Sequence, residues 1–248
     1  MPQATLNLNG ATLVADLSGA LWWPERRILA VADLHLEKGS GFASRGRMLP
    51  PYDTAMTLGR LEAVARRLGP QQVICLGDSF HDAGAAERLA AEDAKRLSRL
   101  IAGFDWLWVS GNHDPAPPVR WGGAVAEETA IGPLVFRHVA RGDRPGEVSG
   151  HYHPKATVHV RDMRISSRCF VGDHRSLVLP AFGAFTGGLN VLDPAISGLF
   201  DGGFIVHLLG ERRIHTFPRH RLASAAGVPA RSPAAAFPPG RRAAPHTR

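Results

Sequence analysis

Apolar residues in the first half of the chain gather in short runs, each of which ends in a polar or turn residue. Such runs lie within RILAVAD (residues 27–33), QQVICLGD (71–78) and FDWLWVSGN (104–112). An apolar run of this length, bounded by turn residues and rich in β-branched and aromatic side chains, predicts a buried strand. We therefore expect three buried strands in this half of the chain.

Between these runs, apolar residues recur every three or four positions over residues 52–68 and again over 85–101. This period predicts two amphipathic helices, and Gly69-Pro70 predicts the end of the first. Strands that alternate with helices favour parallel pairing, because each helix carries the chain back to the start of the next strand. The first half therefore predicts an α/β fold with a parallel sheet.

After Pro133 the pattern changes to short runs typical of β-structure, with Gly and Pro between them. These runs are PLVFRHV, TVHV, RISSRCFVG, SLVLPAF, GFIVHLL and RRIHTF. Two further short strands are expected at residues 5–8 and 12–15. The last segment is rich in Ala, Pro and Arg without periodicity, which predicts disorder. We expect one domain over residues 1–218 and a disordered tail over 219–248.

The formal net charge of +7 comes mostly from that tail. Six of the 29 basic residues lie in 219–248, which holds no acidic residue, so residues 1–218 are close to neutral. Such a tail is expected to add only non-specific, salt-sensitive attraction to a polyanion. No leader or membrane-spanning run is evident, which predicts a cytoplasmic protein without membrane contact. Cys75 and Cys169 lie in apolar runs and are expected to be buried rather than paired.

Polar residues follow each of the three predicted parallel strands. They are Asp33-Leu34-His35, Gly77-Asp78 and Ser110-Gly111-Asn112-His113-Asp114. The carboxyl ends of parallel strands share one edge of a sheet, where α/β proteins build their sites. Later β-runs are followed by His138 and by Gly150-His151-Tyr152-His153. The pattern predicts that carboxylates, an amide and several imidazoles meet at one edge.

Each of these motifs also has a structural interpretation: a helix cap or turn for Asp33-x-His35, a turn for Gly77-Asp78, a buried histidine for His138 and a solvent-facing pair for His151-x-His153. Together they supply mixed oxygen and nitrogen donors, which suit Mn, Fe or Zn rather than Mg alone. On an extended segment, residues two apart face the same side and can reach one ion. A carboxylate between two ions can bridge them.

The ordered motifs D-x-H, G-D, G-N-H-D, a lone His and G-H-x-H resemble the calcineurin-like metallophosphoesterase superfamily over residues 33–154. The strings ADLHLEKG, GDSFHD, SGNHDP, GHYHPKA and LPAFGAFTGGLNV are more narrowly similar to the bacterial ligase-associated DNA damage response endonucleases, from about residue 25 to residue 209. This resemblance implies an α/β fold in which two packed mixed β-sheets are flanked by helices, an α/β/β/α sandwich.

The resemblance also implies a role for each motif residue. One divalent ion would be held by Asp33, His35, Asp78 and His153. The other would be held by Asp78, Asn112, His138 and His151. His113 would face the phosphoryl group and either stabilise its charge or protonate the leaving oxygen, with Asp114 as its orienting partner. Where many superfamily members have an acidic residue or asparagine, this chain has His81, which is interpreted either as a substrate contact or as a core or surface histidine.

The expected reaction is hydrolysis of a phosphodiester by water activated between two ions, with Mn as the favoured metal. Arg45 and Arg47, in a glycine-rich segment after the first ligand pair, are interpreted either as contacts to a substrate phosphate or as solvated residues of an irregular connection.

The favoured function is a DNA endonuclease linked to repair, with DNA repair proteins as partners implied by the resemblance alone. A phosphoesterase for nucleotides or nucleotide sugars and a non-catalytic protein-binding scaffold are the alternatives. The oligomeric state is left open.

Overall fold

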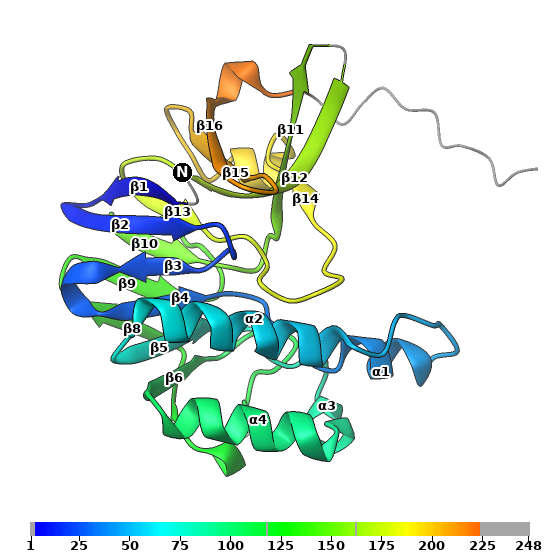
Figure 1. Ribbon diagram of the computed structural model, residues 1–248. Helices are drawn as coiled ribbons and strands as arrows, with labels where there is room; N and C mark the ends of the chain where they lie inside the picture. Colours follow the sequence, from blue (N-terminus) through cyan, green and yellow to red (C-terminus); the bar gives the residue numbers. More distant parts are fainter. Residues whose placement is uncertain (1–2, 118, 162, 224–248) are drawn as a thin grey trace, which may run out of the picture.

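The computed structural model describes residues 3–117, 119–161 and 163–223. Its centre is a pair of mixed β-sheets that pack face to face, with helices on the outer side of the first sheet (Figure 1). A short helix and its flanking loops cover the outer side of the second sheet. The sandwich of two mixed sheets flanked by helices is therefore confirmed.

The first sheet has seven strands among the described residues, hydrogen-bonded in chain order. They are β1 (Gln3–Leu8), β2 (Ala11–Asp16), β3 (Leu21–Trp23), β4 (Ile28–Val31), β5 (Gln72–Leu76), β6 (Asp105–Val109) and β7 (Ala124–Ala126). Neighbours from β1 to β4 run antiparallel, whereas those from β4 to β7 run parallel. The three expected parallel strands are thus confirmed. Their carboxyl ends share one edge, which we call the rim.

The second sheet is built from the later part of the chain and is also mixed. Its strands are β8 (Glu128–Ile131), β9 (Leu134–Arg137), β10 (Glu147–Ser149), β11 (Pro154–Val160), β12 (Met163–Gly172), β13 (Ser176–Val178), β14 (Leu189–Asn190), β15 (Ile205–Leu209) and β16 (Ile214–Pro218). Strand β10 pairs in parallel with both β9 and β13, whereas β11, β12 and β15 pair antiparallel. The expected change to β-structure after Pro133 is confirmed.

Three apolar clusters hold these layers together. One lies between the sheets and includes Leu13, Phe136 and Phe170. The second joins the first sheet to its helices, and a third lies between the second sheet and α5 (Pro194–Ser197). Strand β4 is buried along its whole length because it has a core on each face, as a central parallel strand should. Cys75 and Cys169 are free and buried in these clusters.

The helices agree with the sequence prediction in one case and differ in another. Helix α2 (Asp53–Leu68) ends where Gly69 takes a left-handed conformation, as its sequence predicted. The single helix expected over 85–101 is instead split into α3 (Ala85–Arg88) and α4 (Ala91–Ala102). Their packing partners explain the break, because α3 contacts α1 (Lys38–Ala43) whereas α4 packs on α2 and β6. The side chain of Arg88, at the end of α3, is also held by Asp82 and Ser40.

The chain remains ordered for five residues beyond the expected domain end at 218. A 3₁₀ turn, η3 (Arg219–Arg221), follows β16, and the Ala223 N–H donates to the carbonyl of Thr157. Two further 3₁₀ turns are η1 (Pro24–Arg26) and η2 (Val119–Trp121). The rest of the tail, 224–248, lies outside the described residues, so its disorder stays a prediction. No helix among the described residues is long and apolar enough to cross a membrane.

Candidate metal centre

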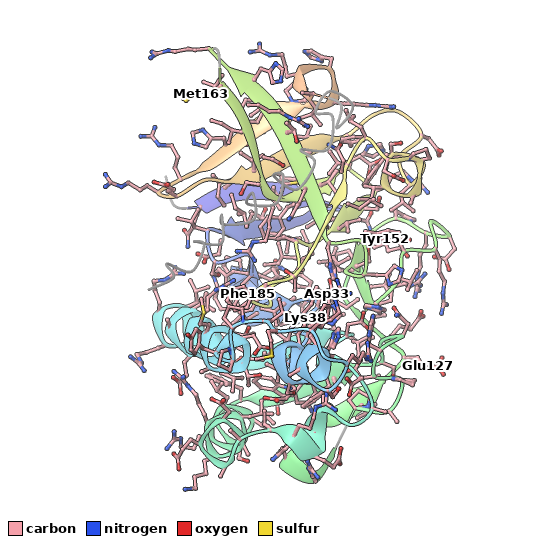
Figure 2. All side chains as sticks on the ribbon, turned by 90° about the vertical axis from the view of Figure 1, so that its right-hand side faces the viewer. Asp33, Lys38, Glu127, Tyr152, Met163 and Phe185 are labelled. Atoms are coloured by element: carbon pink, nitrogen blue, oxygen red, sulfur yellow. The ribbon has the colours of Figure 1, made fainter. Side chains whose placement is uncertain are left out.

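The residues after β4, β5 and β6 meet at the rim, together with histidines from the second sheet. Ligand atoms of Asp33, His35 and His153 all lie within 4.8 Å of one another, and we call these residues the first ligand set. The Nε2 atoms of His35 and His153 are 3.2 Å apart, and Nε2 of His153 is 3.6 Å from Oδ1 of Asp33. Figure 2 shows Asp33 at this edge, near Lys38.

A second group forms beside it from Asp78, His138 and His151, whose ligand atoms also lie within 4.8 Å of one another. The Oδ1 atom of Asn112 is 2.9 Å from Nε2 of His138 and 2.8 Å from Nδ1 of His151. These two nitrogens are themselves 3.2 Å apart. We call these four residues the second ligand set.

Asp78 lies between the two sets. Its Oδ1 is 3.4 Å from Nε2 of His138, in the second set, and its Oδ2 is 3.9 Å from Nε2 of His35, in the first. One carboxylate thus presents one oxygen to each set. This is the arrangement that a bridging carboxylate between two ions requires.

The donor atoms fit divalent metal ions. Two nitrogens bound to one ion at about 2.0–2.1 Å stand roughly 3 Å apart. The observed nitrogen pairs, His35 with His153 and His138 with His151, are each separated by 3.2 Å. Asp33 and Asp78 are buried, and a buried carboxylate needs a cation or several donors beside it. The geometry therefore suits ions of the Mn, Fe or Zn type in both sets.

The pKa values of two ligand histidines also favour metal binding, whereas the pKa of a third, His138, is raised, because its hydrogen bond to Asp78 and the nearby carboxylate charges outweigh its burial. Burial lowers the pKa of His35, with a further contribution from His153. Burial likewise lowers the pKa of His151, with a further contribution from His138. Neutral imidazoles are the form that binds metals. The Nδ1–H of His138 donates to the carbonyl of Leu76 at 2.9 Å, which leaves its Nε2 free to face Asn112 and Asp78.

The backbone that presents these ligands is left-handed rather than extended. Asp33, His35, Asp78, His151 and His153 have φ values of 55°, 44°, 46°, 71° and 47°. Asp33 and His35 share one ligand set, whereas His151 and His153 are divided between the two sets. The expected extended geometry is wrong, because all four residues lie on left-handed backbone. Such positions cost about 1–3 kcal/mol each and persist only where the surroundings hold them.

Hydrogen bonds between the ligand segments supply that support. The His151 N–H donates to both carboxylate oxygens of Asp33, at 3.1 and 3.0 Å. The His35 N–H donates to the carbonyl of Asp78 at 2.9 Å, and the His113 N–H to Oδ1 of Asp78 at the same distance. Hydrogen bonds from backbone N–H groups therefore hold the ligand residues in place, in addition to contacts between their side chains.

A glycine at position 77 is needed for this arrangement, and its replacement provides a test. Gly77 has φ +72°, and a Cβ there would overlap the ring of His138. We expect Gly77→Ala to cost more than about 1 kcal/mol of stability and to weaken metal binding by the second set. Urea unfolding and metal titration check both effects.

Gly10 provides the matched control for this substitution. It has φ +85° with no atom within 4 Å of an added Cβ. We therefore expect Gly10→Ala to cost stability through backbone strain but to leave metal binding unchanged. Equal metal affinities in the two variants would contradict the proposed role of Gly77.

A buried arginine holds the strand that carries His138. The side chain of Arg137 is 3% exposed; it donates to Glu147 at 3.0 Å and Asp143 at 2.8 Å, and it pairs with Glu128 at 3.1 Å. Glu147 is buried and would lose its charged partner in Arg137→Ala. We expect that variant to lose about 3–5 kcal/mol of unfolding free energy.

The control is Arg144→Ala, which removes a pair to Glu128 from a side chain that is 44% exposed. We expect it to lose at most about 1 kcal/mol. Chemical denaturation of both variants measures the difference, and equal losses would show that the buried network contributes no more than a surface pair.

His113 and Asp114 do not form the expected pair. The Nδ1–H of His113, an exposed residue, donates to the carbonyl of His81 at 2.8 Å, which leaves Nε2 available to a substrate. Oδ2 of buried Asp114 instead accepts the Ser79 and Phe80 N–H groups, at 2.8 and 3.0 Å. Burial raises the pKa of Asp114 to about 7, and the charge of Asp78 adds to this. Asp114 therefore shapes the turn after β5, and a backbone carbonyl orients His113.

The three residues expected to contact substrate lie on one side of the site. His81 is buried, and its ring stacks on His113 with centroids 5.4 Å apart. Burial, helped by the charge of Lys38, lowers the pKa of His81 to about 4. Arg47 lies over the ring of Phe42 at 5.4 Å, and Arg45 is 3.9 Å from Asp82. Both arginines are exposed.

The segment after the first ligand pair differs from the expected irregular connection. It contains α1, whose start is tied to α2 because the Gly39 N–H donates to Asp53 at 2.9 Å and the Glu37 N–H donates to Thr54 at 2.8 Å. The sequence analysis missed Lys38 in this helix. Its charge lowers the pKa of both His35 and His81, so it lies close to the site. The signal for it was its place three residues after His35.

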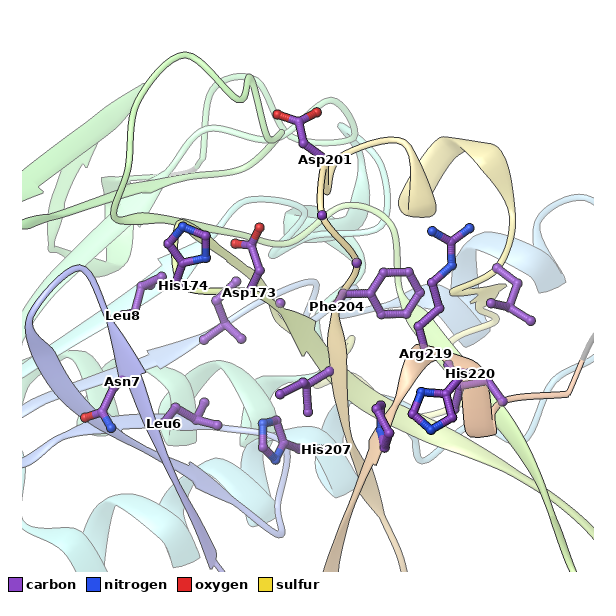
Figure 3. A pocket seen from close by; sticks show the side chains of 18 of the residues that line it. Leu6, Asn7, Leu8, Asp173, His174, Asp201, Phe204, His207, Arg219 and His220 are labelled. Carbon is purple, nitrogen blue, oxygen red and sulfur yellow. The ribbon is translucent and has the colours of Figure 1, made fainter.

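A separate hollow of about 1110 Å³ lies elsewhere, between β1, the start of β15 and η3 (Figure 3). His174, His207 and His220 line it, but none of the predicted site residues does. In the part of the chain that the structure describes, the groups of His, Cys, Asp and Glu close enough to share an ion all include residues of the rim site. The candidate metal centre therefore lies at the rim.

Two solved structures are similar to this chain. The chain is similar to Pseudomonas putida nuclease MPE in its crystal structure, with 25% identity, a TM-score of 0.66, and coverage of 87% of this chain and 100% of that one. Yfce, a phosphoesterase from E. coli, has 12% identity and a TM-score of 0.38, covering 77% of this chain and 97% of that one. The search of curated proteins returned no match.

The family model described as calcineurin-like phosphoesterase matches residues 26–175, which include every residue of the two ligand sets. The chain belongs to the calcineurin-like phosphoesterase family and is a metal-dependent phosphoesterase.

Proposed function

We propose that this protein is a dinuclear-metal phosphodiesterase that cuts DNA. The position of Asp78 carries the proposal, because its two oxygens face the two ligand sets separately. Asp33, His35, Asp78 and His153 would hold one ion. Asp78, Asn112, His138 and His151 would hold the other. Mn is the metal we favour for this mixed oxygen and nitrogen donor set.

When bound, the ions would activate a water molecule near neutral pH, and their positive charge would also stabilise the negative charge on the phosphoryl oxygens. The protein itself must orient the ester and supply a proton to the leaving oxygen. His113 suits that role, because a carbonyl holds its Nδ1–H and its side chain is exposed beside the ligand sets. Its Nε2 is the atom that would deliver the proton.

Three cations support an anionic polymer as the substrate. Lys38 lies close enough to His35 and His81 to lower the pKa of both. Arg45 and Arg47 lie just beyond α1, and the side chain of Arg45 is 64% exposed. Such residues can bind backbone phosphates on either side of the scissile bond. The similarity to a nuclease of solved structure also favours a nucleic acid as the substrate, and the choice of DNA rests on the endonuclease resemblance. A role in repair, which rests on the endonuclease resemblance, and a cytoplasmic location are part of this proposal.

A comparison of substrates tests the DNA assignment. The metal-stripped protein, with Mn added back, is given supercoiled plasmid, a small chromogenic phosphodiester and mononucleotides. We expect Mn to restore nicking of the plasmid as well as hydrolysis of the small ester. Hydrolysis of the small ester or of mononucleotides without nicking would support the metal centre but contradict DNA as the substrate. A nucleotide-like substrate would then be favoured.

A further inference from the structure

A loop from the second half of the chain crosses the first ligand set and carries an exposed aromatic residue. At its start, the Gly183 N–H donates to the carbonyl of Asp33 at 3.1 Å. At its end, the Leu189 N–H donates to the carbonyl of His153 at 3.2 Å. Both acceptors belong to ligands of the same proposed ion. Phe185 lies between these two attachments, two residues after Gly183 (Figure 2).

Further contacts fix the backbone of this loop. The Phe182 N–H donates to the carbonyl of Ala32 at 2.8 Å, and the Ala184 N–H donates to Oγ1 of Thr57 at 2.9 Å. A Cβ at Gly188 would lie 2.6 Å from the carbonyl oxygen of His153, so the chain passes too close there for any side chain. The position of Phe185 relative to the first ligand set is therefore set by the backbone on both sides.

Phe185 itself has two features that folding does not explain. Its φ is +55°, a left-handed conformation that favours Gly or Asn and is an outlier for a bulky residue. Its side chain is exposed, at 42%, while the neighbouring Phe182 and Ala184 are buried. An aromatic side chain held in a strained conformation and exposed beside a catalytic centre indicates a contact with a ligand.

We propose that Phe185 stacks on a nucleobase next to the scissile phosphate. This inference rests on the proposed function, in which the substrate is DNA. A base that flanks the phosphate at the ligand sets must lie over the adjoining surface, where Phe185 presents its ring. Stacking on an aromatic ring tolerates any base, so the contact would position the strand without reading its sequence.

The test uses an end-labelled single-stranded oligonucleotide with an unmodified phosphodiester backbone, and cleavage at one central phosphodiester is read from the length of the labelled product. The nucleotide on one side of that bond, and then on the other, carries either adenine or an abasic analogue. Loss of a stacked base is expected to lower kcat/KM of the wild-type protein about 5- to 100-fold on one side. Phe185→Ala is expected to lower kcat/KM similarly with adenine present and to show no further loss with the abasic strand.

Three variants control for folding and strain. Phe185→Trp is expected to retain the response to the base, and Phe185→Gly, which suits the left-handed backbone, is expected to lose it without loss of thermal stability. Met163→Ala, an exposed apolar residue far from the site in Figure 2, is expected to behave as wild type.

The outcomes separate the two proposals. If wild type and Phe185→Ala respond equally to removal of the base, the stacking proposal is overturned while the nuclease proposal stands. If wild type responds to removal of neither flanking base, the stacking proposal is likewise overturned. If the wild-type protein cuts none of the oligonucleotides and no plasmid, the nuclease proposal fails and the stacking proposal fails with it.

Discussion

Replacement of Asp78 by Asn is expected to abolish metal-dependent turnover. The substitution removes the negative charge that faces both ligand sets and replaces one of the two oxygens with an NH₂ group, which cannot bind a metal. Changes to residues that merely support metal ligands cost about 10–100-fold in affinity or activity, so loss of a shared ligand is expected to cost more. Metal analysis and the hydrolysis rate with Mn added back measure the two effects.

The control for this prediction is Asp201→Asn, the same change at an exposed residue that lines the hollow of Figure 3. It is expected to match the wild-type protein in metal content and rate. An Asp78→Asn variant that binds two ions and keeps its rate would show that the site works without a bridging carboxylate.

Replacement of His113 by Ala is expected to leave both ions bound and to lower the rate about 10²–10⁴-fold. A ring nitrogen of His113 lies within 4.8 Å of ligand nitrogens of His35 and His81. Its Nδ1–H is bound to the carbonyl of His81, however, and we place His113 in neither ligand set. The loss should be largest for DNA, whose leaving oxygen needs a proton, and smaller for a nitrophenyl ester, whose leaving group departs without one. Rates on both substrates measure this difference.

His159→Ala is the matched control, because His159 is exposed on β11. It is expected to retain the wild-type rate on both substrates. Normal turnover by His113→Ala would show that His113 is not the proton donor. An equal loss on both substrates would show that it acts on phosphoryl charge and does not protonate the leaving group.

The sequence predicted the rim because parallel strands bring their carboxyl ends together. Asp33, Asp78 and Asn112 each follow a separate apolar run, so their convergence required only the βαβαβ order. The histidines of the second sheet were identified by their positions after later β-runs and by the family resemblance. Their approach to the rim depends on how the two sheets pack, which the local pattern does not encode.

Other features depended on tertiary contacts that no local pattern shows. The left-handed backbone at Asp33 and His151 is held by hydrogen bonds between segments more than 100 residues apart. The break between α3 and α4 depends on which surfaces each helix meets. Asp114 follows His113 directly in the sequence, yet its carboxylate points to the turn after β5. Phe185 lies in a Gly-rich segment whose sequence does not single it out, and only its φ value and its exposed side chain distinguish it from its neighbours.

The most direct measurement is a titration of the metal-stripped protein with Mn, in which bound metal and the rate of plasmid nicking are recorded at each step. We predict that nicking is absent without metal and reaches its plateau when two ions are bound per chain. A plateau with one ion bound would contradict the shared role of Asp78. Nicking without metal, or no nicking with two ions bound, would contradict the proposal of a metal-dependent nuclease.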